Sequence, residues 1–267
     1  MKFLKKIITK SPKLLEILVR LHCIYKFVNL PVVFRVLFYG SYEAKPLHYD
    51  LIPRLCHNFL NKGDYVLCDI GANHGVFSKN VLRYSANIKI IAFEPQKSCQ
   101  IYLDDITKKY KNFEVRFIGI GDVKKELEFN QYSNDGLSSF KEIQDGAYQS
   151  HTEGTNTEEK YPVRISTLDK ELEFIENKNI FLKIDVQGLE KEVLDGAKKL
   201  FSEERIAGIY IELMCKSKYQ NDTYEYFINY LSSEGFIISD LATGYRDEHN
   251  GFIDEFDVLF LHKKFFK

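Results

Sequence analysis

The chain has 267 residues and a mass of 31.3 kDa, which is enough to bury a core without a metal or disulfide support. Its hydrophobic fraction of 45% and charged fraction of 28% are those of an ordinary globular protein and exclude a wholly disordered chain. Lys and Arg number 37 against 38 Asp and Glu, a net charge of −1. The chain therefore lacks the basic excess of a dedicated nucleic-acid-binding protein, and no nucleic-acid partner is expected.

Residues 1–50 differ from the rest of the chain because they are both basic and apolar. They carry nine Lys and Arg but three Asp and Glu, and apolar side chains recur at helical spacing between residues 14 and 28. Arg20, Lys26 and Arg35 divide the apolar stretch, so a membrane-spanning helix is not predicted. We expect a helical N-terminal arm that packs on the main domain or on a second copy of the chain, forming a homodimer. The alternative is a basic amphipathic helix in peripheral contact with a membrane surface.

The beginning of the chain does not predict secretion. MKFLKK resembles the basic part of a signal peptide, but Lys10, Lys13 and Glu16 interrupt the apolar core that should follow, and no small-residue cleavage site is present. The five cysteines are scattered and never spaced C-x-x-C, so neither a disulfide framework nor a zinc cluster is predicted. We expect a cytoplasmic protein, with the inner face of the membrane as a peripheral alternative.

Strands and helices alternate through residues 51–267, which we interpret as one main domain. Buried strands are predicted at 65–70, 88–94, 113–120, 179–186, 207–213, 236–241 and 257–263. Amphipathic helices are predicted at 76–85, 97–110, 189–201 and 221–234. Continuous apolar strands between such helices indicate an α/β fold, with a mostly parallel sheet covered on both faces. No helix fits between the last two strands, which are therefore expected to be antiparallel neighbours.

The segment 123–162 interrupts this alternation. It contains one short predicted strand at 126–132, followed by a polar stretch that includes Asn134, Asp135 and Gly136. A long polar connection inside a compact domain is usually either functional or poorly ordered. We expect a lid or insertion, or else a loop, beside the ligand site.

A glycine-containing turn joins the first predicted strand to the first helix. Gly71 permits the tight turn, and Gly75 lets a ligand approach the backbone where the helix begins. Glu94 ends the second strand, nineteen residues beyond Gly75. A carboxylate at that place typically accepts hydrogen bonds from the ribose hydroxyls of a nucleoside.

The same turn indicates which nucleoside cofactor is bound. The turn has Asn73 between its glycines and not the G-x-G-x-x-G spacing of a dinucleotide site, whose helix N-terminus holds a pyrophosphate. Asp69, which begins the turn, would repel a pyrophosphate but would suit the cationic groups of S-adenosylmethionine. The alternative is a purely structural strand–helix turn with a capping Asp.

At this point the sequence resembles the FkbM-type S-adenosylmethionine-dependent methyltransferases. The resemblance rests on four segments: DIGANHGVFS at 69–78, FEP at 93–95, NDGLSSF at 134–140, and residues 166–197, which include FLKIDVQGLEKEVLDGA. It implies a seven-stranded, Rossmann-like class I methyltransferase fold and methyl transfer to a hydroxyl, often of a sugar, glycan or secondary metabolite. The chain departs from the family at Gln187, where the family usually has an acidic residue, which puts in doubt any role of position 187 in base or metal chemistry.

The strand ends supply the predicted catalytic residues. A hydroxyl is a very weak acid, so a base near the acceptor oxygen assists its methylation. Asp185 ends the fourth strand and is the first choice for this role, with Glu212 near the end of the adjacent fifth strand as the second and His74 in the cofactor turn as the third. Each has a structural alternative, as a buried acid or a local hydrogen-bonding group.

Further residues are assigned by analogy with this fold and family. Asp122, after the third strand, is where the fold commonly contacts the adenine amine, and Ser139 lies in a family segment beside the site. A cation between Asp185, Glu190 and Glu212 is conceivable, but nothing in the spacing requires one, and no metal is predicted. Two other functions stay open: N-methylation or aminopropyl transfer from the same cofactor, and a cofactor-binding module without turnover.

Overall fold

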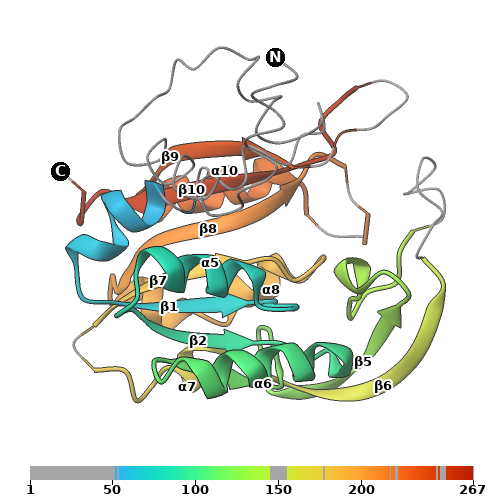
Figure 1. Cartoon of the computed structure of the whole chain (residues 1–267). Coiled ribbons are helices and arrows are strands. Elements are labelled where there is room, and N and C mark those ends of the chain that lie inside the picture. The colour runs from blue at the N-terminus through green and yellow to red at the C-terminus, as the bar shows by residue number, and fades with distance from the viewer. Residues whose placement is uncertain are drawn as a thin grey trace, which may run out of the picture.

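The computed structural model describes residues 52–266, except for positions 53, 145–154, 177, 217, 220–221, 245 and 247–250. The predicted N-terminal arm, residues 1–50, lies outside the described residues, and its helices and packing stay predictions. The described chain forms a seven-stranded sheet with helices on both faces (Figure 1), as the alternating sequence pattern predicts.

The large sheet has the order β3-β2-β1-β7-β8-β10-β9. Strand β10 is antiparallel to both β8 and β9, whereas the other pairs are parallel, so the prediction for the last two strands is confirmed. This is the class I fold that the resemblance implies. Its strand order switches between β1 and β7, where open parallel sheets bind ligands beyond the carboxyl ends of the strands. The strands are β1 (Tyr65–Ile70), β2 (Lys89–Phe93), β3 (Phe113–Arg116), β7 (Asn179–Ile184), β8 (Ile206–Met214), β9 (Phe236–Thr243) and β10 (Glu255–His262).

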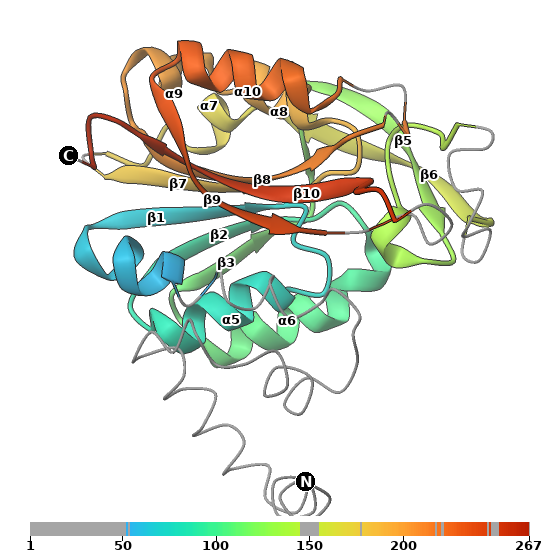
Figure 2. The same ribbon diagram turned by 90° about the horizontal axis from the view of Figure 1, so that it is seen from above.

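Apolar side chains on the two faces of the sheet bury two core layers. On β1, Val66, Cys68 and Ile70 belong to one layer and Leu67 to the other. Figure 2 shows helices on both sides of the sheet. Among the described helices, none is long and apolar enough to cross a membrane. The Leu67 side is covered by α5 (Val76–Tyr84) and α6 (Gln100–Lys109), and the other side by α7 (Leu168–Glu171), α8 (Glu190–Asp195), α9 (Lys198–Ser202) and α10 (Tyr224–Ser233).

A second, three-stranded sheet lies beside the carboxyl ends of β1 and β2 (Figure 1). Its order is β4 (Gly119–Ile120), β6 (Thr157–Ser166) and β5 (Lys125–Tyr132), and a short 3-10 helix η3 (Asp135–Leu137) follows β5. Most of this sheet comes from the segment 123–162, for which the sequence predicts a lid, insertion or loop with one short strand. The described part of that segment contains an antiparallel ribbon of β5 and the first part of β6, with η3 and its flanking chain after β5.

Strand β6 is absent from the sequence prediction because Pro162 stands in its middle, and proline is rare inside strands. Pro162 lies opposite Glu128 of β5, while β4 pairs only with Ile165 and Ser166. At Pro162 the missing N–H therefore faces a side on which no described strand pairs. The single strand predicted at 113–120 is also wrong, because β3 stays in the large sheet and β4 joins the small one.

The single helix predicted at 189–201 is two helices, α8 and α9. They are separated at Gly196, where a Cβ would lie 2.0 Å from the carbonyl oxygen of Gly121. The carboxylate of Asp169 then caps the second helix, accepting hydrogen bonds from Lys199 N at 2.9 Å and Leu200 N at 3.0 Å. The break thus brings the helix layer against the end of β4, close to the ligand site.

The approach of the β1 turn to β7 gives a test of the fold. Gly71 has a φ of +76°, and a Cβ there would lie 1.8 Å from the carbonyl oxygen of Asp185. Gly251 has a matching φ of +73° but has nothing within 4 Å of its hypothetical Cβ. We expect Gly251→Ala to lower the free energy of unfolding by about 1–2 kcal/mol, the cost of a left-handed non-glycine residue. Gly71→Ala should cost a further 1–3 kcal/mol or more, roughly that of overpacking.

Urea denaturation of both variants measures the difference. Equal losses would mean that the contact between the turn and the backbone at Asp185 is not the constraint at Gly71.

Candidate functional site

The turn after β1 is folded against the end of β2 by backbone hydrogen bonds. Gly71 N and Ala72 N both donate to the carbonyl oxygen of Phe93, at 3.0 and 3.2 Å. Asn73 has a left-handed φ of 48°, and its N–H donates to Oε2 of Glu94 at 2.6 Å. The turn and the strand-end acid that the sequence singles out separately are therefore one structural unit.

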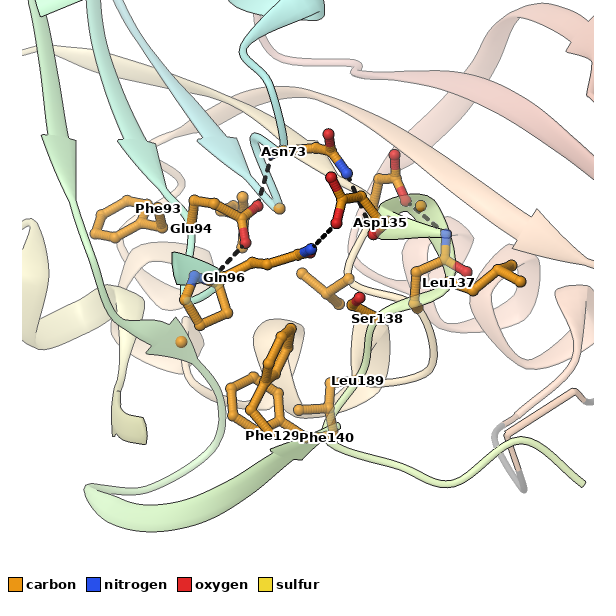
Figure 3. Close-up of a pocket in the computed structure, with 18 of the residues that line it drawn as sticks. Asn73, Phe93, Glu94, Gln96, Phe129, Asp135, Leu137, Ser138, Phe140 and Leu189 are labelled. Atoms are coloured by element: carbon orange, nitrogen blue, oxygen red, sulfur yellow. Dashed lines mark hydrogen bonds between the residues drawn. The ribbon is translucent and has the colours of Figure 1, made fainter. Parts of the chain in front are cut away.

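Glu94 is only 5% exposed and lines a pocket (Figure 3). Its second oxygen, Oε1, accepts a hydrogen bond from Gln96 N at 2.8 Å. Burial raises the pKa of Glu94 to about 7, although these two backbone N–H groups favour the ionised form. A carboxylate has about four acceptor positions, so roughly two are left to accept the two hydroxyls of a ribose.

The pocket has a volume of about 550 Å³, within the usual range for small-molecule sites. In Figure 3, Asn73, Glu94, Gln96 and Asp135 lie together in one part of the pocket. Phe129, Phe140 and Leu189 lie together in another part and supply an apolar wall. Ile118, just before β4, and the two residues of β4, Gly119 and Ile120, also line the pocket. These features suit an adenosine group, with a flat apolar base and a hydroxyl-bearing sugar.

Two further carboxylates line the pocket where β7 and β8 end. Gln187 Nε2 donates to Oδ1 of Asp185 at 2.9 Å and to Oε2 of Glu212 at 3.0 Å. Loss of hydration and the neighbouring carboxylates of Asp185, Glu255 and Asp257 raise the pKa of Glu212 well above its usual value. The prediction that these two strands are adjacent is confirmed.

Lys183 lies beneath this group, with 6% of its surface exposed. Its Nζ donates to the carbonyl oxygen of Gly71 at 2.6 Å and pairs with Asp69 at 3.4 Å and Asp185 at 3.3 Å. Burial disfavours the ammonium charge, but Asp185 and Asp69 outweigh it and raise the pKa of Lys183. The lysine therefore carries the positive charge that both acids need.

Five of the predicted site residues line the pocket: Gly71, Asn73, Glu94, Asp185 and Glu212. These five residues lie at or near the ends of strands β2, β7 and β8 and in the turn after β1.

The other five lie outside the pocket lining. The Asp69 carboxylate is fully buried and accepts a hydrogen bond from Ser78 Oγ at 2.5 Å, so it faces Lys183 and α5. At Gly75 a Cβ would lie 2.2 Å from Cδ1 of Ile106, so its neighbour is a helix side chain. Asp69 and Gly75 therefore contact the protein interior and do not line the pocket.

The remaining three also have protein partners. Asp122 is half-buried and pairs with Lys125 at 2.9 Å, and it is not among the residues that line the pocket. His74 Nε2 lies 2.9 Å from Oδ2 of Asp135. Ser139 is buried, and its Oγ donates to the carbonyl oxygen of Gln187 at 2.6 Å.

Several residues of the site are missing from the sequence prediction. Lys183 has a detectable signal, since it is a charged residue inside an otherwise apolar buried strand, two positions before Asp185. Asp135 accepts from Gln96 Nε2 and from Ser98 Oγ, and thereby joins η3 to the end of β2. Three other residues carry no comparable signal, because only the fold brings them to the site. Lys218 and Glu255, the first residue of β10, line the pocket, and the Tyr219 hydroxyl donates to Oε1 of Gln187.

One group of described side chains has potential metal-ligand atoms within 4.8 Å of one another: His74, Cys99 and Asp135. Burial raises the pKa of the Cys99 thiol, which opposes the thiolate that a metal requires. His74 and Asp135 already bind one another. This group therefore joins the cofactor turn to η3 and has little of the character of a metal site.

Comparison with known families agrees with this geometry. The family model described as the methyltransferase FkbM domain matches residues 69–238. No curated protein matches the chain.

The solved structures that match are distant. Precorrin-6y C5,15-methyltransferase from Geobacter metallireducens GS-15 is 12% identical, with a TM-score of 0.41 over 79% of this chain and 88% of that one. Magnesium protoporphyrin IX methyltransferase from Synechocystis PCC 6803, with bound S-adenosylhomocysteine, is 10% identical, with a TM-score of 0.42 over 92% and 94%. A putative tRNA (m1A22) methyltransferase from Streptococcus pneumoniae, in complex with S-adenosyl-L-methionine, is 12% identical, with a TM-score of 0.43 over 78% and 71%. Likenesses this weak do not bear on what this chain binds or methylates.

The raised pKa of Glu94 predicts pH-dependent nucleoside binding. Ribose hydroxyls donate to the ionised carboxylate, and one pH unit below a pKa of about 7 roughly a tenth of it is ionised. The affinity for 5′-methylthioadenosine, a nucleoside without a titrating amino acid group, should therefore be roughly tenfold weaker at pH 6 than at pH 8. Glu94→Gln should weaken binding by about 1–3 kcal/mol at pH 8 and abolish this pH dependence.

Calorimetric titration at both pH values provides the measurement. A Glu94→Gln protein with wild-type affinity and wild-type pH dependence would remove Glu94 from the ribose site.

Proposed function

Because the chain belongs to the FkbM methyltransferase family and uses S-adenosylmethionine, we propose that it methylates a hydroxyl of a sugar, a glycan or another secondary metabolite. The observation that carries the proposal is the pair of pocket carboxylates, Asp185 and Glu212, at the ends of adjacent strands in the same pocket as Glu94. A hydroxyl acceptor needs a group that takes its proton, and carboxylates at this place supply one.

The described residues fit the cofactor at one end of the pocket. S-adenosylmethionine, when bound, supplies a methyl group on a positively charged sulfur. Glu94 would accept the ribose hydroxyls, while the apolar residues Ile118, Ile120 and Leu189 would enclose the adenine. Gly71 leaves the backbone of the turn uncovered by a side chain where it reaches the pocket.

Asp185 is the proposed proton acceptor. Its side chain is 35% exposed and lines the pocket, and Lys183 and Gln187 each hold one of its two oxygens. The raised pKa of Glu212 favours its protonated form, in which it would donate a hydrogen bond to the acceptor. Positioning of the acceptor oxygen and this base together would lower the barrier, by roughly 7–11 kcal/mol from positioning alone.

The charge of the pocket supports an acceptor without phosphates. Its described lining includes five carboxylates. It includes one lysine, Lys218, whose Nζ donates to Oε2 of Glu255 at 2.8 Å. An acidic pocket repels a phosphate backbone, so we propose that the partner is a small molecule or glycan and not a nucleic acid. We further propose a cytoplasmic location, with the arm 1–50 supplying a homodimer contact or a peripheral membrane contact.

Replacement of Asp185 tests the chemistry separately from cofactor binding. We expect Asp185→Asn to lower the rate of methyl transfer by about 10²–10⁴-fold, the usual contribution of a general base. Its affinity for S-adenosylhomocysteine should fall much less. Asp105→Asn, at the exposed pair with Lys108 on α6, is the matched control and should keep the wild-type rate.

The assay follows labelled methyl groups from S-adenosylmethionine into panels of sugars and glycans, with mass spectrometry of the products. Methyl groups on nitrogen, or release of methylthioadenosine instead of S-adenosylhomocysteine, would replace the O-methylation proposal by N-methylation or aminopropyl transfer. Cofactor binding without any product would indicate a binding module. Full activity of Asp185→Asn would remove Asp185 as the base.

A further inference from the structure

Gln187 lies between two carboxylates and satisfies both with one amide group. Its Nε2 is 2.9 Å from Oδ1 of Asp185 and 3.0 Å from Oε2 of Glu212. Its Oε1 accepts a hydrogen bond from the hydroxyl of Tyr219 at 3.1 Å. The two N–H groups of the amide therefore point toward the acids and its oxygen toward a donor, which uses each polar atom of the side chain.

The backbone of Gln187 is held in an unusual conformation. Its φ is 54°, in the left-handed region that non-glycine residues seldom adopt. Its carbonyl oxygen accepts from Ser139 Oγ at 2.6 Å, and Glu190 accepts from Gly188 N at 3.0 Å on the other side. Such strain persists where surrounding contacts determine it, and here those contacts direct the amide between the acids.

The amide occupies a place that otherwise suits a cation. Two carboxylates this close to one nitrogen favour each other's protonation unless something positive or hydrogen-bonding lies between them. Lys183 reaches the other oxygen of Asp185, at 3.3 Å, so the ammonium is already engaged below. Carboxylate oxygens that converge on one point are typical ligands of Mg²⁺ or Ca²⁺. In this chain that point is occupied by N–H groups.

We propose that Gln187 is a positioning residue that holds Asp185 and Glu212 together in place of a divalent cation. Its importance for catalysis rests on the proposed function, in which Asp185 is the base. Its hydrogen bonds to the two acids can be tested without any acceptor, so failure of one proposal is distinguishable from failure of the other.

The first test converts the amide into a third carboxylate. In Gln187→Glu the acids at 185, 187 and 212 present only oxygens, and we expect the variant to gain affinity for Mg²⁺ and Mn²⁺. At a cation concentration ten times the dissociation constant its melting temperature should rise by roughly 3–6 °C. The wild type should show no such rise and no change with EDTA. Gln100→Glu, an exposed position on α6, is the charge-matched control and should behave as the wild type does.

The second test removes the hydrogen-bond donors without adding a charge. Gln187→Met should lower the melting temperature more at pH 8 than at pH 5, because only ionised carboxylates need the N–H groups. A packing role alone would lower it equally at both pH values. The proposal is overturned if the wild type itself binds the cations, if Gln187→Glu gains no affinity for them, or if the deficit of Gln187→Met is the same at both pH values. If the wild type does not bind S-adenosylhomocysteine, that result would instead contradict the proposed function.

Discussion

The ligand site depends on the contacts of one buried ammonium group, that of Lys183. It contacts the carbonyl oxygen of Gly71 and the carboxylates of Asp69 and Asp185, and so connects the ends of β1 and β7 at the point where the strand order switches. The fully buried Asp69 could not otherwise lie beside a tight turn, because an unpaired buried charge is strongly destabilising. The same contact brings the turn within reach of Asp185, where only a glycine at position 71 fits.

This pairing leaves the pocket with two different kinds of carboxylate. Asp185 faces the pocket while bound to a full positive charge. Glu94 and Glu212 make no ion pair with Lys183, and loss of hydration raises the pKa of both. Different environments for neighbouring acids are what separate proton acceptors from proton donors and hydrogen-bonding groups. The division of roles in the proposed reaction follows from where one lysine lies.

Much of this arrangement follows from the sequence, because the signals are local. Strand periodicity places Glu94, Asp185 and Glu212 at the carboxyl ends of strands in a parallel sheet. The glycine spacing places Gly71 in a turn at the same ends. What the sequence does not show are directions that depend on packing. The carboxylate of Asp69 lies beneath the turn, beside a buried lysine, and Asp122 pairs with Lys125. Tyr219 and Glu255, the first residue of β10, reach the site only through the fold.

The segment from Asn134 to Ser139 contacts residues at both ends of the pocket. At one end Asp135 binds His74 and Gln96 beside Glu94. At the other end Ser139 binds the carbonyl oxygen of Gln187, whose side chain bonds to Asp185 and Glu212. One short stretch of chain therefore contacts the surroundings of Glu94 and those of Asp185 and Glu212. Since a shift of that stretch moves contacts at both ends, cofactor binding and acceptor positioning would be structurally linked in the proposed reaction, even though their residues come from different strands.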